Sequence, residues 1–101
     1  MDVLPLDQAT LETFAPHVGE SFSGVLAGVQ IELTLVEATE LAGGHPDRTR
    51  EPFSLLFQTG ALGHVRQGLL QLSHPILGNQ EIFVVAVKGD EKWMYFEAIF
   101  N

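Results

Sequence analysis

Cysteine is absent from this 101-residue chain, so it can form no disulfide, thiolate metal site or cysteine nucleophile. Small secreted domains are often stapled by disulfides, and the absence therefore favours a cytoplasmic location. No apolar run approaches the ~20 residues that span a bilayer. Residues 1–6 also lack the basic and apolar regions of a signal peptide. We therefore expect a soluble protein without a membrane partner.

Positive charge is scarce as well. Five Lys and Arg residues stand against 13 Asp and Glu residues, which gives a formal net charge of −8. A surface of this sign repels nucleic acids and anionic membranes, and we expect neither as a partner. Charged residues make up only 18% of the chain and hydrophobic residues 46%. This balance argues against disorder and indicates that some apolar surface serves a partner.

The length suits one domain with one core, and we expect residues 1–101 to form a single β-rich domain. One short helix is expected at about residues 10–16. Thr10 is its candidate N-cap, and Pro16 and Gly19 end it. A helix this short is not stable alone, so its apolar side must pack against the rest of the domain.

From Ser21 onward, apolar residues recur with a period of two, which predicts β-strands. The clearest strand is 29–39, and a bulge is expected in it at residues 36–38. Short connections make neighbouring strands antiparallel, with 41–51 as the longest loop. About six strands are expected, at 22–26, 29–39, 53–58, 69–74, 81–88 and 93–100. Strands of this number and length curl into a small barrel or a tight sandwich.

The last two strands are apolar on both faces, which is typical of strands with both faces covered. In the first, Phe83 opposes Ile82 and Val84; in the second, Trp93 opposes Met94. Either the N-terminal helix or another protein subunit covers the second face. The candidate interface residues on that face are Phe83, Val85, Val87, Trp93 and Tyr95.

The sequence contains no catalytic, metal or nucleotide-binding motif, and we expect no metal or cofactor. His74 is in phase with Leu70 and Leu72, so its ring points toward the core, where a hydrogen-bonded histidine at the rim is the simpler interpretation. The alternative is a small-molecule-binding barrel, with a ligand or weak enzymatic site near His74 and the 43–51 loop. Guanidinium groups suit anionic ligands, and the candidate ligand-binding residues are His74, Arg66, Arg48 and Arg50.

Five stretches of the chain, in order, carry a resemblance: Leu11–Pro16 with Val18–Phe22, Glu32–Glu37, Glu51–Phe57, His74–Pro75 before Leu77–Gly78, and Tyr95–Asn101. Over nearly the whole chain they resemble a family of small bacterial β-rich proteins classed as a domain of unknown function. That family has no assigned activity, so the resemblance implies no catalytic residue. Members are sometimes encoded near phage-tail-collar-like proteins, which implies a structural or accessory binding role.

The sequence therefore favours a non-enzymatic binding or assembly module. We expect it to self-associate, or to bind a protein partner, through the C-terminal hairpin formed by the last two strands. An accessory role in a phage-tail-like structure is one form of this hypothesis.

Overall fold

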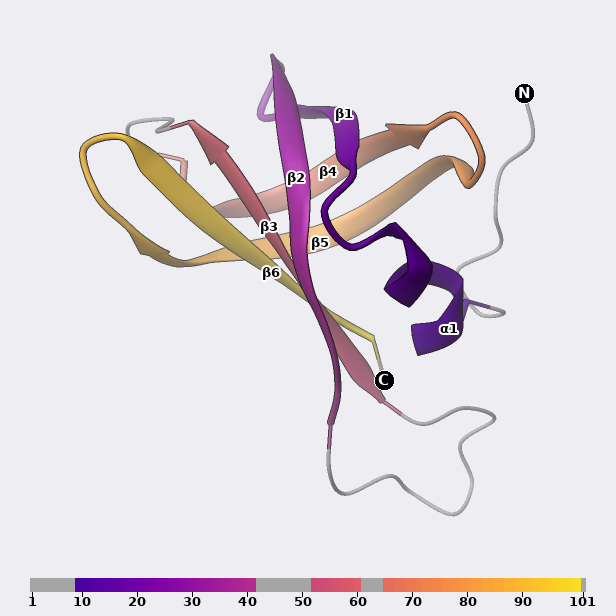
Figure 1. Cartoon of the computed structure of the whole chain (residues 1–101). Helices are drawn as coiled ribbons and strands as arrows, with labels where there is room; N and C mark the ends of the chain where they lie inside the picture. The colour runs from indigo at the N-terminus through magenta and orange to yellow at the C-terminus, as the bar shows by residue number, and fades with distance from the viewer. Residues whose placement is uncertain (1–8, 42–51, 61–64, 101) are drawn as a thin grey trace.

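A computed structural model of the chain describes residues 9–41, 52–60 and 65–100. These residues form one short helical segment followed by six strands (Figure 1). The elements are α1 (Leu11–Phe14), η2 (Ala15–His17), β1 (Ser21–Leu26), β2 (Val29–Glu40), β3 (Phe53–Gly60), β4 (Gln67–His74), β5 (Gly78–Gly89) and β6 (Trp93–Phe100). The expected mainly β class with a short N-terminal helix is confirmed.

The six strands close into a barrel with the order β1-β2-β3-β6-β5-β4, and every neighbouring pair is antiparallel. Of the two architectures expected, the barrel is therefore the one formed. Four pairs join strands that are consecutive in the sequence: β1–β2, β2–β3, β4–β5 and β5–β6. Closure depends on two pairings between strands far apart in the sequence, β1 with β4 and β3 with β6. These long-range pairings bring the two halves of the chain together.

Local sequence explains the turns and the irregularity within the strands. Ala27 and Gly28 both have positive φ, at 52° and 76°, which matches the right-handed twist of a two-residue hairpin. The β2–β3 register shifts between Leu35 and Glu37, which confirms the expected bulge. The strand expected at 81–88 is longer than predicted, because Gly78, at φ +79°, ends the turn and returns the chain to the ladder with β4.

The helical segment packs against one end of the barrel. Phe14 is fully buried, with its ring centroid 6.0 Å from that of Phe53 and 5.7 Å from that of Phe100. Thr10 precedes the helix as expected, and its N–H donates a hydrogen bond to Thr13 Oγ1 at 3.0 Å. In Figure 1, α1 lies on the opposite side of the barrel from the tip of the β5–β6 hairpin. The helix therefore completes the core and does not cover the outer face of that hairpin, where Phe83 is exposed. The prediction that the N-terminal helix covers this face is wrong.

Alternation within the strands assigns their two faces as expected. Along β5, Ile82 and Val84 are buried while Phe83 and Val85 are exposed. The buried side chains of all six strands meet in one core with those of the helical segment. Within the described ranges, no helix has the length and apolar character needed to cross a membrane.

Candidate functional site

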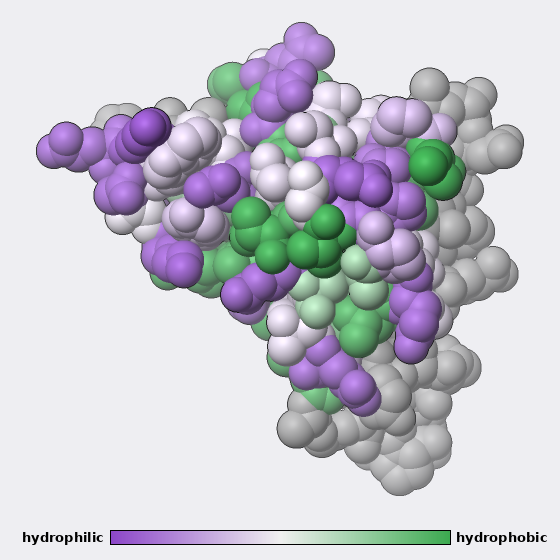
Figure 2. Space-filling model, in the orientation of Figure 1, coloured by the Kyte–Doolittle hydropathy of each residue, from purple (hydrophilic) through white to green (hydrophobic). Residues whose placement is uncertain are grey.

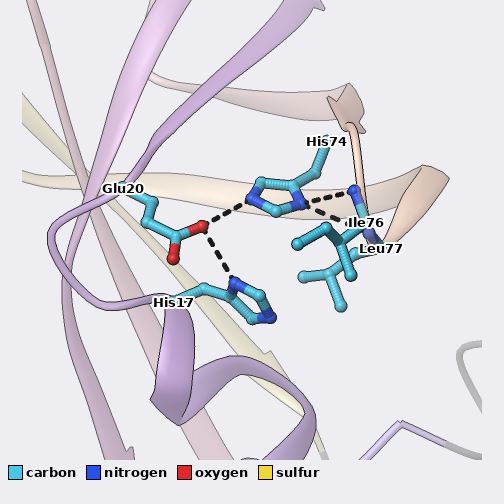
Figure 3. Close-up of polar contacts among 5 residues, drawn as sticks. All are labelled: His17, Glu20, His74, Ile76 and Leu77. Carbon is cyan, nitrogen blue, oxygen red and sulfur yellow. Dashed lines mark hydrogen bonds and ion pairs between the residues drawn. The ribbon is translucent and has the colours of Figure 1, made fainter.

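His74 ends β4 and lies 6% exposed at the rim of the barrel. Its ring packs against that of Phe22, with centroids 4.5 Å apart, and against that of His17, at 4.8 Å. Both ring nitrogens form hydrogen bonds, as Figure 3 shows. His74 thus has the buried, hydrogen-bonded position at the rim that its phase in the strand predicts.

The partners of His74 define where its proton lies. Nδ1 accepts from the backbone N–H groups of Ile76, at 3.1 Å, and Leu77, at 3.2 Å. A nitrogen that accepts two such bonds carries no proton, so the proton of the neutral ring lies on Nε2. Nε2 accordingly donates to Oε1 of Glu20 at 2.8 Å. The turn after β4 therefore fixes the tautomer of His74.

Glu20 receives a second imidazole on the same oxygen. Nδ1 of His17, from η2, lies 2.9 Å from Oε1, so that the two imidazoles lie next to each other beside the carboxylate (Figure 3). Hydrogen bonds from His17 first, and then from His74, lower the pKa of the Glu20 carboxyl from its ordinary value of 4.5. One carboxylate thus links the helical segment to the end of β4, and we call His17, Glu20 and His74 the rim cluster.

Two histidines and a glutamate are ligands that zinc and related metals accept, and the donor atoms of the rim cluster lie within 4.8 Å of one another. The hydrogen bonds of His74 do not fit such an ion. A neutral histidine bound to a metal through Nε2 carries its proton on Nδ1 and donates it to an acceptor. Here two backbone N–H groups donate to Nδ1. The chemistry of the cluster is therefore that of a hydrogen-bonded carboxylate.

The candidate ligand residues do not all gather around His74. Arg66 immediately precedes β4, whereas His74 ends it, so eight residues of extended chain, about 26 Å at ~3.3 Å each, separate them. Arg66 instead lines a cavity of about 660 Å³ together with Lys88 and Met94, near the tip of the β5–β6 hairpin. Arg48, Arg50 and the whole of the 43–51 loop lie outside the described residues.

The candidate interface residues lie together on the outer face of the β5–β6 hairpin. Phe83 is 52% exposed and pairs with Leu69 of β4, itself 56% exposed. The same face carries further apolar side chains, exposed except for the half-buried Tyr95, and among them the acid Glu97, which pairs with Val85. We call the apolar set the hairpin face: Leu69, Phe83, Val85, Val87, Trp93, Tyr95 and Ile99. Figure 2 shows the view of Figure 1, in which apolar residues reach the surface in groups with hydrophilic residues between them. On the hairpin face, the apolar residues lie on three adjacent strands, β4, β5 and β6.

Tyr95 is the most constrained member of this face. Its hydroxyl accepts a hydrogen bond from Nε2 of Gln58 on β3 at 2.8 Å. Nζ of Lys88 lies 4.6 Å from the centre of its ring, in a cation–π contact. Lys92 makes a similar contact with Trp93, at 5.5 Å. The rings of Tyr95 and Trp93 are therefore each in contact with the ammonium group of a lysine.

The bases of the chain concentrate near the hairpin tip. Of the five Lys and Arg residues, Arg66, Lys88 and Lys92 lie there. The acids Asp90 and Glu91 are in the same region, but the carboxylate of Asp90 accepts hydrogen bonds from two backbone N–H groups of the hairpin turn. These two bonds, from Trp93 first and then Lys92, also lower its pKa from the ordinary value of 3.8. The tip thus carries charges of both signs, three bases and two acids, on a chain that is acidic as a whole.

The rim cluster was not expected from the sequence. Its local part, His17 and Glu20, has a spacing of three residues across the glycine turn that follows η2. Nothing local connects these residues to His74, 54 positions further along the chain. The link is made by the pairing of β1 with β4, which brings the start of one strand beside the end of the other.

The family model of the domain of unknown function DUF6916 matches residues 9–100 of the chain. Comparison with curated proteins and with solved structures finds no match. The expected membership of a family without an assigned activity is confirmed. Because the match covers nearly all of its 101 residues, the chain belongs to the DUF6916 family.

Proposed function

We propose that this domain is a non-enzymatic protein-binding module and that it binds through the hairpin face. The observation that carries the proposal is the exposure of large apolar side chains on three adjacent strands, with Leu69, Phe83 and Ile99 each more than half exposed. Contiguous apolar surface of this kind marks interaction sites in soluble proteins. The aromatic residues at the hairpin tip add to it, because Trp and Tyr are enriched in protein interfaces.

The backbone beneath this face is well defined, which suits recognition. β5 and β6 form a ladder from Val85–Glu97 to Gly89–Met94, and the inner side chains of both strands belong to the core. A rigid sheet loses little conformational entropy when it binds, so more of the contact energy remains as affinity. The exposed side chains of the hairpin face are therefore attached to a preorganised backbone.

Binding of a small molecule near His74 has less support. One ring nitrogen of His74 donates to Glu20 and the other accepts from the backbone, so the ring has no free polar atom for a ligand. His74 also lies at the far end of β4 from Arg66. An accessory role in a phage-tail-like structure remains one form of the protein-binding proposal.

A comparison of proteins retained by immobilised variants tests the proposal. We expect Phe83→Glu to abolish binding of a partner that the wild-type chain retains, because it places a charge in the middle of the hairpin face. Ile76→Glu is the matched control, since Ile76 is 76% exposed and lies in the turn after β4, outside that face. Equal retention by wild-type, Phe83→Glu and Ile76→Glu chains would contradict the proposal. Thermal melting of each variant confirms that it is folded.

A further inference from the structure

A groove of about 460 Å³ lies on the outer face of β1, β4 and β5, on residues that do not belong to the hairpin face. Its volume is within the range of roughly 300–1,000 Å³ that is usual for small-molecule sites. The exposed or half-buried residues that line it have mostly polar side chains: Ser23, Gln30, Gln71, Ser73, Asn79 and Glu81. We call this feature the polar groove.

Strand pairing brings these side chains together in two rows across the three strands. Outward-facing residues follow one another at every second position, so the rows lie about 7 Å apart at ~3.3 Å per residue. The apolar side chain of Val25 belongs to the second row and also lines the groove. The first row consists of Ser23, Ser73 and Asn79, and the second of Val25, Gln71 and Glu81.

Most polar groups of the groove are available to a ligand. Among the described residues, the side chains of Gln30, Gln71 and Glu81 form no hydrogen bond or ion pair. The hydroxyl of Ser73 donates to Oδ1 of Asn79, which leaves the amide N–H groups of Asn79 as donors. The two glutamine amides supply both donors and acceptors, and the carboxylate supplies acceptors. The groove therefore offers hydrogen-bonding groups of both kinds.

Charge and polarity restrict the class of ligand. Of the described residues that line the groove, only Glu81 is charged, and its sign matches the net charge of −8, so an anion is repelled. A hydrocarbon would remove water from the amides without replacing its hydrogen bonds, which costs free energy. A neutral ligand rich in hydroxyl groups avoids both costs, because each hydroxyl donates one hydrogen bond and accepts others.

We infer that the polar groove binds a neutral saccharide of one or two sugar units. Hydroxyl groups on the sugar ring bond to Gln71 and Glu81 of the second row, and the C–H side of the ring packs against Val25, which is 36% exposed. This binding activity is separate from the proposed protein binding, since the groove and the hairpin face share no residue.

Nuclear magnetic resonance of the ¹⁵N-labelled full-length chain tests the inference. Glucose, galactose, mannose and N-acetylglucosamine are added in turn, and the shifts of the backbone amides are followed. We expect at least one sugar to give saturable shifts at the amides of residues 23–25, 71–73 and 79–81. The expected dissociation constant is about 1–10 mM, which suits a ligand of about twelve non-hydrogen atoms in an open groove.

Two glutamines of β4 provide a matched pair of variants. Gln71→Ala is expected to raise the dissociation constant by about three- to tenfold, because one or two hydrogen bonds to the sugar are lost. Gln67→Ala should leave it unchanged, since Gln67 is exposed on the same strand but does not line the groove. Glu81→Ala should weaken binding at least as much as Gln71→Ala, because hydrogen bonds to a charged acceptor are stronger. The amide spectrum of each variant shows whether it is folded.

Three outcomes would overturn the inference. The first is the absence of saturable shifts at the groove for all four sugars up to about 100 mM, well above the expected dissociation constant. The second is an equal response to glycerol, which would show unspecific solvation by hydroxyl groups. The third is saturable binding of the neutral peptide N-acetyl-trialanine amide in place of the sugars, which would make the groove a peptide site. Protein retention through Phe83 is unaffected by any of them, so the proposed function and this inference can fail independently.

Discussion

Replacement of Gln80 by methionine should stabilise the protein. Gln80 lies on β5 in phase with Ile82 and Val84 and is only 5% exposed. Its side-chain Oε1 and Nε2 are both buried without a hydrogen-bond partner among the described residues. A buried amide without partners costs about 1–3 kcal/mol, and methionine has nearly the same shape without polar atoms.

We therefore expect Gln80→Met to raise the free energy of unfolding by about 1–2 kcal/mol, part of the penalty being offset by imperfect packing of the thioether. For a domain of this size, each kcal/mol corresponds to roughly 4–8 °C in Tm. Urea unfolding followed by circular dichroism measures the first quantity, and a thermal melt measures the second.

The matched control is Gln71→Met. Gln71 lies on the neighbouring strand β4 but is exposed, so its amide is hydrated and its replacement should change stability by less than about 0.5 kcal/mol. A loss of stability of about 1 kcal/mol or more in Gln80→Met would contradict this expectation. It would show that the amide is hydrogen-bonded in solution and contributes to the core.

Four further results are expected. His74→Leu should destabilise the domain by about 1–3 kcal/mol in urea unfolding, because two backbone N–H groups of the following turn lose their acceptor. The pKa of Glu20 is lowered in the folded state, so its contribution to stability is full above its ordinary value of 4.5 and is lost as the pH falls through the lowered folded pKa. Glu20→Gln should therefore show a weaker loss of stability in this acid range than the wild type, and an equal loss would contradict the assignment. Gly24→Ala should cost about 1–3 kcal/mol, since a Cβ there would lie 2.8 Å from Leu70 Cδ1 and 3.0 Å from a backbone oxygen of β4; an unchanged Tm would contradict this packing. Ala27→Asn should raise stability by about 0.5–1 kcal/mol, because asparagine tolerates the positive φ of this turn better than alanine does.

The alternation of apolar residues was sufficient to predict the strands and the face to which each side chain points. Phe83 and Val84 occupy opposite faces because successive side chains of a strand point in opposite directions, whatever the strand is paired with. The bulge near Val36 and the turn at Ala27 were equally local and are confirmed. Such features depend on the backbone geometry of a few neighbouring residues.

The position of the helix in the fold could not be predicted from neighbouring residues in the sequence. Composition required that α1 bury an apolar side, but it did not say against which strands. Phe14 contacts Phe53 and Phe100, which are 39 and 86 positions away and become neighbours only when β3 pairs with β6. That pairing leaves the outer side of the β5–β6 hairpin exposed.

The class of fold, the strands and the two-faced character of the C-terminal hairpin could thus be predicted from the sequence, since each follows from period and turn chemistry. Which residues meet in space depends on the closed barrel. Pairing of β1 with β4 assembles His17, Glu20 and His74, and the barrel separates Arg66 from His74 by the length of a strand. The physical reason is that strand registry over long sequence distances is set by closure of the whole barrel, which no short window of sequence contains.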